Sequence, residues 1–184
     1  MRHGFMEAVA ERLAARGVAT FRYQFPYTEQ GSPRPDPPPV LMATVRSAVA
    51  AAAEAAGDLP LLAGGKSMGG RMTSMAAAEK PLLGVCSLVF FGFPLHAAGK
   101  PGVERGEHLA RVEVPMLFLQ GTRDRLAELP LLHPLLSRLG NRARLHVVND
   151  ADHSFHVPKS SGRSDQEVLE ELTQAVSEWA SRRQ

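Results

Sequence analysis

A glycine-flanked serine between a short apolar run and a helical run constrains the fold of this chain most strongly. The stretch Leu61–Arg71 reads LLAGGKSMGGR and contains the pentapeptide G-x-S-x-G around Ser67. In a strand-to-helix turn this pentapeptide holds the serine in strained backbone, and small residues flank it where neighbouring chain comes close. The pentapeptide alone is a weak signal, so its setting matters. We expect Ser67 to stand exposed at the end of a strand, where a helix begins.

Apolar runs typical of strands alternate with helical patterns along the chain. We expect strands at Val18–Tyr23, Leu59–Ala63, Val85–Phe91, Met116–Gln120 and Arg144–Val148. We expect helices at Phe5–Arg16, Pro39–Ala56, Met68–Glu79, Glu107–Val112 and Leu126–Leu139, and a last helix after a capping box at Ser164 and Glu167. The alternation predicts a three-layer α/β/α sandwich with a mostly parallel sheet of about five strands. The length of 184 residues favours one domain, residues 1–184.

Composition excludes several classes of partner. The formal net charge is +2 and the basic residues are dispersed, so no nucleic-acid stripe or basic membrane patch is expected. The single cysteine, Cys86, lies in an apolar run and predicts a buried thiol, with no disulfide framework and no cysteine metal site. Glu7 and Glu11 interrupt the apolar region that a signal peptide needs, and the apolar segment Pro81–Leu95 is shorter than a bilayer requires. We therefore expect a cytoplasmic protein with no membrane partner.

Two further polar residues follow predicted strands in the order that serine catalysis uses in this architecture. A serine needs a base to take its proton and a carboxylate to orient that base. Asp124 follows the strand Met116–Gln120, and His153 follows the strand Arg144–Val148. Ligand sites in parallel sheets lie outside the carboxyl ends of the strands, and the chain order serine, acid, histidine suits this fold class. The sequence predicts that Ser67, Asp124 and His153 meet.

Each partner of the serine has rivals at this stage. Asp124 could cap the helix Leu126–Leu139, and Asp150 or Asp152 could be the acid instead. The rival histidines are His96, His146 and His156.

Residues that border the predicted strand ends are candidates for substrate binding. Phe93 and Pro94 follow the strand Val85–Phe91 and are expected to line an acyl pocket, and Tyr27 is a weaker candidate.

Taken together, these motifs resemble those of a known protein family. The chain resembles the α/β-hydrolase superfamily, in particular the small single-domain group related to dienelactone hydrolases and to the testis-expressed and histone-acetyltransferase-complex hydrolase-like proteins. The resemblance rests on Phe5–Ala10 with Phe21–Tyr27, on Gly64–Arg71, on Gln120–Asp124 and on Asp152–Phe155. It implies Ser67 as nucleophile, His153 as general base and then acid, Asp124 as orienting carboxylate and the backbone N–H of Met68 as an oxyanion donor. It implies no cofactor and no metal.

The beginning of the chain departs from the family pattern. Family members have further strands, and the strand before the first helix ends in a His-Gly-type loop that supplies a second oxyanion donor. Here His3-Gly4 imitates that dipeptide without a preceding strand, so the chain resembles a member shortened at its N-terminus. Without the missing strand, Val18–Tyr23 either slides inward to pair with Leu59–Ala63 or leaves an exposed edge, through which a homodimer could form. We expect the slide.

Two functions follow from this sequence. The first is a serine hydrolase that acts on a small-molecule carboxylic ester or thioester through an acyl-enzyme. The alternative is a catalytically weak or inactive scaffold that acts through protein contacts.

Overall fold

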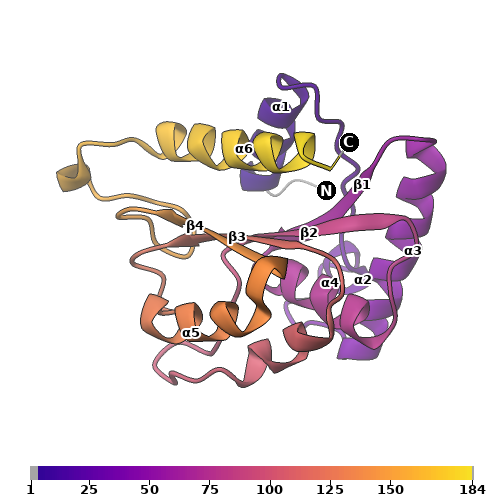
Figure 1. Cartoon of the computed structure of the whole chain (residues 1–184), viewed down its shortest axis with the longest axis horizontal. Coiled ribbons are helices and arrows are strands. Elements are labelled where there is room, and N and C mark those ends of the chain that lie inside the picture. Colours follow the sequence, from indigo (N-terminus) through magenta and orange to yellow (C-terminus); the bar gives the residue numbers. More distant parts are fainter. Residues whose placement is uncertain (1–3, 184) are drawn as a thin grey trace.

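The computed structural model describes residues 4–183 and shows a parallel sheet between two layers of helices (Figure 1). The strands are β1 (Leu61–Lys66), β2 (Val85–Phe91), β3 (Met116–Gly121) and β4 (Ala143–Val148), adjacent in that order. The helices are α1 (Gly4–Ala14), α2 (Pro26–Glu29), α3 (Pro38–Ala56), α4 (Met68–Glu79), α5 (Leu129–Leu139) and α6 (Asp165–Ser181), with 3₁₀ turns η1 (Glu104–Arg111), η2 (Gly140–Arg142) and η3 (Lys159–Ser161). Every neighbouring strand pair is parallel, which confirms the predicted α/β/α sandwich.

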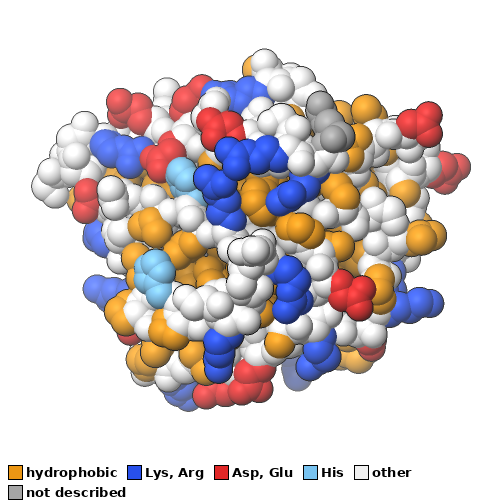
Figure 2. Space-filling view, viewed as in Figure 1, with side chains coloured by type: hydrophobic (Ala, Val, Ile, Leu, Met, Phe, Trp, Pro, Cys, Tyr) orange, Lys and Arg blue, Asp and Glu red, His pale blue; other side chains and the backbone are white. Residues whose placement is uncertain are grey.

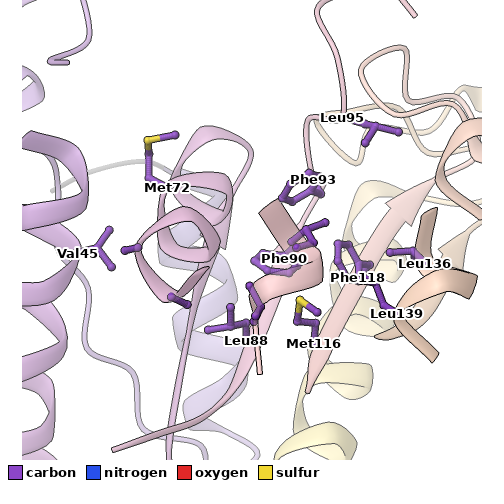
Figure 3. Packing of buried hydrophobic residues seen from close by; sticks show 14 of the residues in the cluster. Val45, Met72, Leu88, Phe90, Phe93, Leu95, Met116, Phe118, Leu136 and Leu139 are labelled. Atoms are coloured by element: carbon purple, nitrogen blue, oxygen red, sulfur yellow. The ribbon is translucent and has the colours of Figure 1, made fainter. Parts of the chain in front are cut away.

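Strand β2 shows how one apolar run serves both faces of the sheet. Val89 and Phe91 point into the cluster formed by α1 and α6, whereas Leu88 and Phe90 point into the cluster formed by α3, α4 and α5. Successive side chains of a strand alternate between faces, so a strand covered on both sides is apolar throughout. In Figure 3, Phe90 lies between Phe93 and Phe118, and its ring centroid is 5.4 Å and 4.7 Å from theirs.

Local sequence signals explain where helices α5 and α6 begin. The predicted capping box is formed, because the Ser164 side chain accepts from the Glu167 backbone N–H and the Glu167 side chain accepts from the Ser164 backbone N–H. Helix α5 begins at Leu129, so Pro130 falls in its first turn, where a missing N–H leaves no hydrogen bond unmade.

The predicted strand Val18–Tyr23 is wrong. The structure shows no strand in this segment, and within residues 4–183 strand β1 pairs only with β2. The sheet therefore has four strands instead of about five. The physical reason is that the segment connects opposite layers: Val18 N–H donates to the Leu13 carbonyl at the end of α1, while Tyr23 packs with Phe25 on the side of α3 and α4. In Figure 1 this indigo segment descends from α1 past β1.

An apolar groove lies beside β1, at the position that another neighbouring strand would occupy. Its volume is about 440 Å³, and its walls are β1, the segment 17–23, and side chains of α1, α3 and α6. Phe21 and Leu59, at its rim, are 52% and 63% exposed. We call this feature the β1 groove. The homodimer expected through an exposed sheet edge stays a prediction.

Helix α3 forms the outer wall of the same side of the molecule. By length and composition its 19 residues could cross a bilayer, with 17% of the tested window buried. Leu41 and Val45 are buried, while Arg46 donates to the Ala76 and Lys80 carbonyls at the end of α4. Figure 2 shows apolar side chains scattered over this side, where α3 exposes a series of alanines.

Cys86 differs slightly from its predicted environment. It lies in β2 as expected, but it is half-buried between the buried residues Val85 and Ser87.

Candidate active site

The turn between β1 and α4 holds Ser67 in a backbone conformation that side chains rarely adopt. Its φ is 51° and its ψ is −122°, and its N–H donates to the Phe91 carbonyl of β2 at 3.0 Å. A non-glycine residue in this region costs about 1–3 kcal/mol and persists only when the surroundings enforce it. The enforced turn places Ser67 at the carboxyl end of β1, where the residue is half-buried and not exposed as expected.

Strand β1 and helix α4 come closest at Gly65 and Gly70, whereas the pentapeptide suggests Gly65 and Gly69. A Cβ added at Gly70 would lie 2.7 Å from the Gly65 carbonyl oxygen and 3.0 Å from Phe90 Cδ1. A Cβ added at Gly69 would meet nothing within 4 Å. The first glycine of the pentapeptide is thus crowded as expected, while the crowded partner on the helix is Gly70.

The structure brings the three predicted polar side chains together in one hydrogen-bonded chain. His153 Nε2 lies 2.8 Å from Ser67 Oγ, and His153 Nδ1 lies 2.7 Å from Asp124 Oδ2. The Asp124 side chain is fully buried, whereas 23% of the His153 side chain is exposed. Solvent therefore reaches the His153 side chain but not the Asp124 carboxylate.

The rival acids have other partners. Asp152 Oδ1 accepts from the backbone N–H groups of Ser154 and His156, so it stabilises its own loop. Asp150 has a φ of 60°, and its backbone N–H donates to Thr122 Oγ1. Asp124 Oδ1 also accepts from the Leu126 N–H at 2.8 Å, but α5 begins only at Leu129 with Glu128 before it, so this bond closes a turn and does not cap the helix.

The rival histidines lie elsewhere. His146 Nε2 is 2.8 Å from Glu171 Oε1 on α6, and His156 pairs with Asp165 at the start of the same helix. The pKa of His156 is raised because its ring is hydrogen-bonded to the Asp165 carboxylate. His96 is buried, and its Nδ1 lies 3.0 Å from the Ala97 carbonyl oxygen.

Gln120 supports the acid, and the sequence reading missed it. Its side-chain N–H donates to Asp124 Oδ2, and its Oε1 accepts from the Phe93 backbone N–H at 3.1 Å. The side chain is fully buried in β3. The available signal was a polar residue at the end of the otherwise apolar run Met116–Gln120, since buried polar groups are retained where they are hydrogen-bonded.

The backbone N–H expected to stabilise an oxyanion lies at the start of α4. The Met68 N–H donates to no acceptor within residues 4–183, as expected for the first residue of a helix. The second donor that the resemblance implies belongs to the His3-Gly4 dipeptide at best. His3 lies outside the described residues, and Gly4 begins α1.

The candidate substrate-binding residues are placed differently from one another. Phe93 is 1% exposed and packs in the core against Phe90 and Phe118, and Pro94 is buried beside it. Tyr27 is half-buried on α2, where its ring stacks on Phe25. Their contribution to substrate binding stays a prediction. Residues 4–183 contain no group of three or more side chains suited to bind a metal ion.

The fold is similar to those of several solved structures. An α/β serine hydrolase homologue from Coxiella burnetii matches with a TM-score of 0.71 at 18% identity, over 93% of this chain and 75% of that one. A monoacylglycerol lipase from Paleococcus ferrophilus matches with a TM-score of 0.72 at 16% identity, over 99% and 90%. A Klebsiella pneumoniae protein ascribed to the dienelactone hydrolases matches with a TM-score of 0.66 at 22% identity, over 98% and 82%. The family model described as an alpha/beta hydrolase domain matches residues 1–181, and the chain belongs to this family.

Proposed function

We propose that this protein is a serine hydrolase that cleaves carboxylic esters or thioesters. Ser67 is the nucleophile, His153 the general base and acid, and Asp124 the carboxylate that orients the imidazole. The observation that carries the proposal is the hydrogen-bonded chain from Ser67 Oγ through His153 to Asp124, with links of 2.8 Å and 2.7 Å.

The hydrogen-bond partners of His153 support a direction for the proposed proton transfer. Asp124 is a buried acceptor, so His153 carries its proton on Nδ1 and presents an unprotonated Nε2 to the Ser67 hydroxyl. Gln120 donates to the same Asp124 oxygen, which keeps the carboxylate fixed while the imidazole charges.

The reaction proceeds in two halves that mirror each other. Ser67 Oγ attacks the carbonyl carbon as its proton moves to His153 Nε2, and the resulting oxyanion is stabilised by the Met68 N–H at the start of α4. The tetrahedral species expels the alcohol or thiol, which takes the proton from His153. Water then attacks the acyl-enzyme and gives a proton to His153 Nε2. The second tetrahedral species collapses with cleavage of its bond to Ser67 Oγ, which takes the proton back from His153, and the carboxylic acid is released.

An active-site label tests the assignment of the nucleophile. A fluorophosphonate should label the wild type, and a short-chain aryl ester such as p-nitrophenyl acetate should be hydrolysed with release of the phenol. Ser67→Ala should abolish both. Ser154→Ala is the matched control, because Ser154 is an exposed serine next to His153 and should be dispensable. A folded wild type that neither reacts nor turns over would overturn the proposal and favour the scaffold.

A further inference from the structure

Lys66 is the last residue of β1 and precedes Ser67 directly. Its Nζ donates a hydrogen bond to the His153 carbonyl oxygen at 2.8 Å. Ser67 Oγ is 2.8 Å from Nε2 of the same histidine. Two consecutive residues of the turn therefore hold His153, one by its main chain and the other by its ring.

The ammonium of Lys66 sits among aromatic side chains. Nζ lies 4.6 Å from the ring centroid of Phe5 on α1 and 5.0 Å from that of Phe155, and these two rings stack with centroids 5.6 Å apart. Within residues 4–183, no carboxylate oxygen lies within 4.0 Å of the ammonium. Contact with the faces of aromatic rings offsets part of the cost of removing the cation from water.

Burial makes this site unfavourable for a charge. It lowers the pKa of Lys66 to about 8, and the charges of Asp124 and Asp152 oppose the shift only in part. An apolar side chain would fill the same space without this desolvation cost. A lysine here is therefore poorly explained by packing alone, and the bond to His153 is the one hydrogen bond that its ammonium makes to residues 4–183.

The loop that carries His153 requires such a hold. Residues 149–157 contain no strand or helix, and Asp150 and Phe155 have φ values of 60° and 65°. The Asp150 N–H donates to Thr122 Oγ1, and the Ala151 carbonyl accepts from the Arg123 N–H, so both of these bonds fix the loop to the end of β3. Lys66 fixes it to β1, the strand that leads to the nucleophile.

We propose that Lys66 is a positioning residue, whose ammonium holds the His153 main chain so that the imidazole stays within hydrogen-bonding distance of Ser67. This inference rests on the hydrolase function proposed above. Lys66 acts through His153 and touches no reacting atom. Charge-assisted hydrogen bonds are roughly twice as strong as neutral ones, and a catalytic group misplaced by about 1 Å costs on the order of a hundredfold in rate.

Three variants test this role by kinetics with p-nitrophenyl acetate. Near neutral pH, Lys66→Met should lower kcat by about 10- to 100-fold and leave KM within about twofold, because positioning the base affects the chemical step. Lys66→Arg retains a charged donor and should recover most of the loss. The matched control is Lys100→Met, which removes an exposed lysine and should match the wild type. A Lys66→Met variant with the kcat of the control would overturn the proposal.

The pH dependence separates the charge from mere packing. Asp124, Asp152 and His153 are the titratable groups that face the ammonium. Because Lys66 loses its proton with a pKa of about 8, the ratio of wild-type to Lys66→Met kcat should shrink as the pH rises from near neutral to about 9.5. A ratio that stays constant over this range would show that the charge has no part in holding the base.

Hydrogen exchange provides a readout that needs no turnover. Amides in residues 149–157 should exchange several-fold faster in Lys66→Met than in the wild type or in Lys100→Met, since one anchor of the loop is lost. Equal protection in all three proteins would overturn the role of Lys66, even if no ester is hydrolysed. A wild type without turnover would overturn only the proposed hydrolase function.

Discussion

Gly70→Ala is the substitution whose effect follows most directly from the geometry of the serine turn. The new methyl carbon would lie 2.7 Å from the Gly65 carbonyl oxygen and 3.0 Å from Phe90 Cδ1. Gly65 and Phe90 are partners in the ladder between β1 and β2, so neither can move without disturbing the sheet. Relief requires a shift of α4 away from β1 by several tenths of an ångström.

The magnitude follows from two opposing effects. Overpacking of this kind costs about 1–3 kcal/mol, and replacing a helical glycine by alanine returns about 0.5–1 kcal/mol. We expect Gly70→Ala to lower the free energy of unfolding by about 1–2 kcal/mol, which for a chain of this size lowers Tm by about 2–8 °C. Gly69→Ala gains the helix contribution without the clash, so it should raise Tm by about 1–4 °C.

Urea denaturation followed by circular dichroism measures both variants against the wild type. The expected order of urea midpoints is Gly69→Ala above the wild type and Gly70→Ala below it, with similar m-values. In the ester assay, Gly70→Ala should also lower kcat, because the shift of α4 moves Ser67 relative to His153. Equal midpoints for the two variants, or the reverse order, would refute the close approach of β1 and α4.

Three further predictions concern the strained backbone of Ser67, the buried side-chain amide of Gln120 and the buried charge of Lys66. Ser67→Gly and Ser67→Ala should both be inactive. The glycine variant should nevertheless be more stable than the alanine variant by about 1–2 kcal/mol, because only glycine accepts φ 51° and ψ −122° freely. Identical urea midpoints for the two variants would contradict this. Gln120→Leu should lower kcat and should lower the free energy of unfolding by about 1–3 kcal/mol, because the Phe93 N–H loses its acceptor and Asp124 loses a donor. A variant with wild-type kinetics would show that Gln120 does not support Asp124. Between pH 8 and 10 the unfolded chain binds more protons at Lys66 than the folded chain does, because its folded pKa is about 8 and its ordinary value is 10.5. The stability of the wild type relative to Lys66→Met should therefore rise with pH across this window, and a difference in urea midpoints that does not change with pH would count against it.

The parts of the fold that could be predicted from the sequence are those with local signals. Apolar runs at β2 and β3 are long enough to be covered on both faces, and the capping box marks the start of α6 without any tertiary information. The meeting of Ser67, Asp124 and His153 could also be predicted, because parallel strands end at the same edge of the sheet.

The segment Val18–Tyr23 could not be assigned from its own residues. A β-branched and aromatic run fits a strand only when a neighbour lies within hydrogen-bonding distance, and the partner is a property of the whole fold. Here the two ends of the segment are fixed by α1 on one face and by the cluster around Tyr23 on the other, which leaves it extended but unpaired.

Sequence patterns gave no signal for the contacts of Lys66 and Gly70, and for Gln120 they gave only its position as a polar residue at the end of an apolar run. Gln120, Lys66 and Gly70 act through distances to residues far along the chain or across the turn. The G-x-S-x-G pattern indicates Gly69 by its position in the sequence alone, whereas the crowding depends on which face of α4 packs against β1. Only the packed structure shows that this face carries Gly70.

The β1 groove has a consequence for how the molecule fluctuates. Strand β1 leads to Ser67, yet on one side its backbone amides face the groove instead of another strand within residues 4–183. Local opening is easiest where few hydrogen bonds must break, so the groove-facing amides of β1 should exchange with solvent faster than those of β2 and β3. The strand that positions Ser67 thus belongs to the less protected part of the sheet. An extended chain bound in the groove would slow the exchange of its amides and rigidify the Ser67 turn.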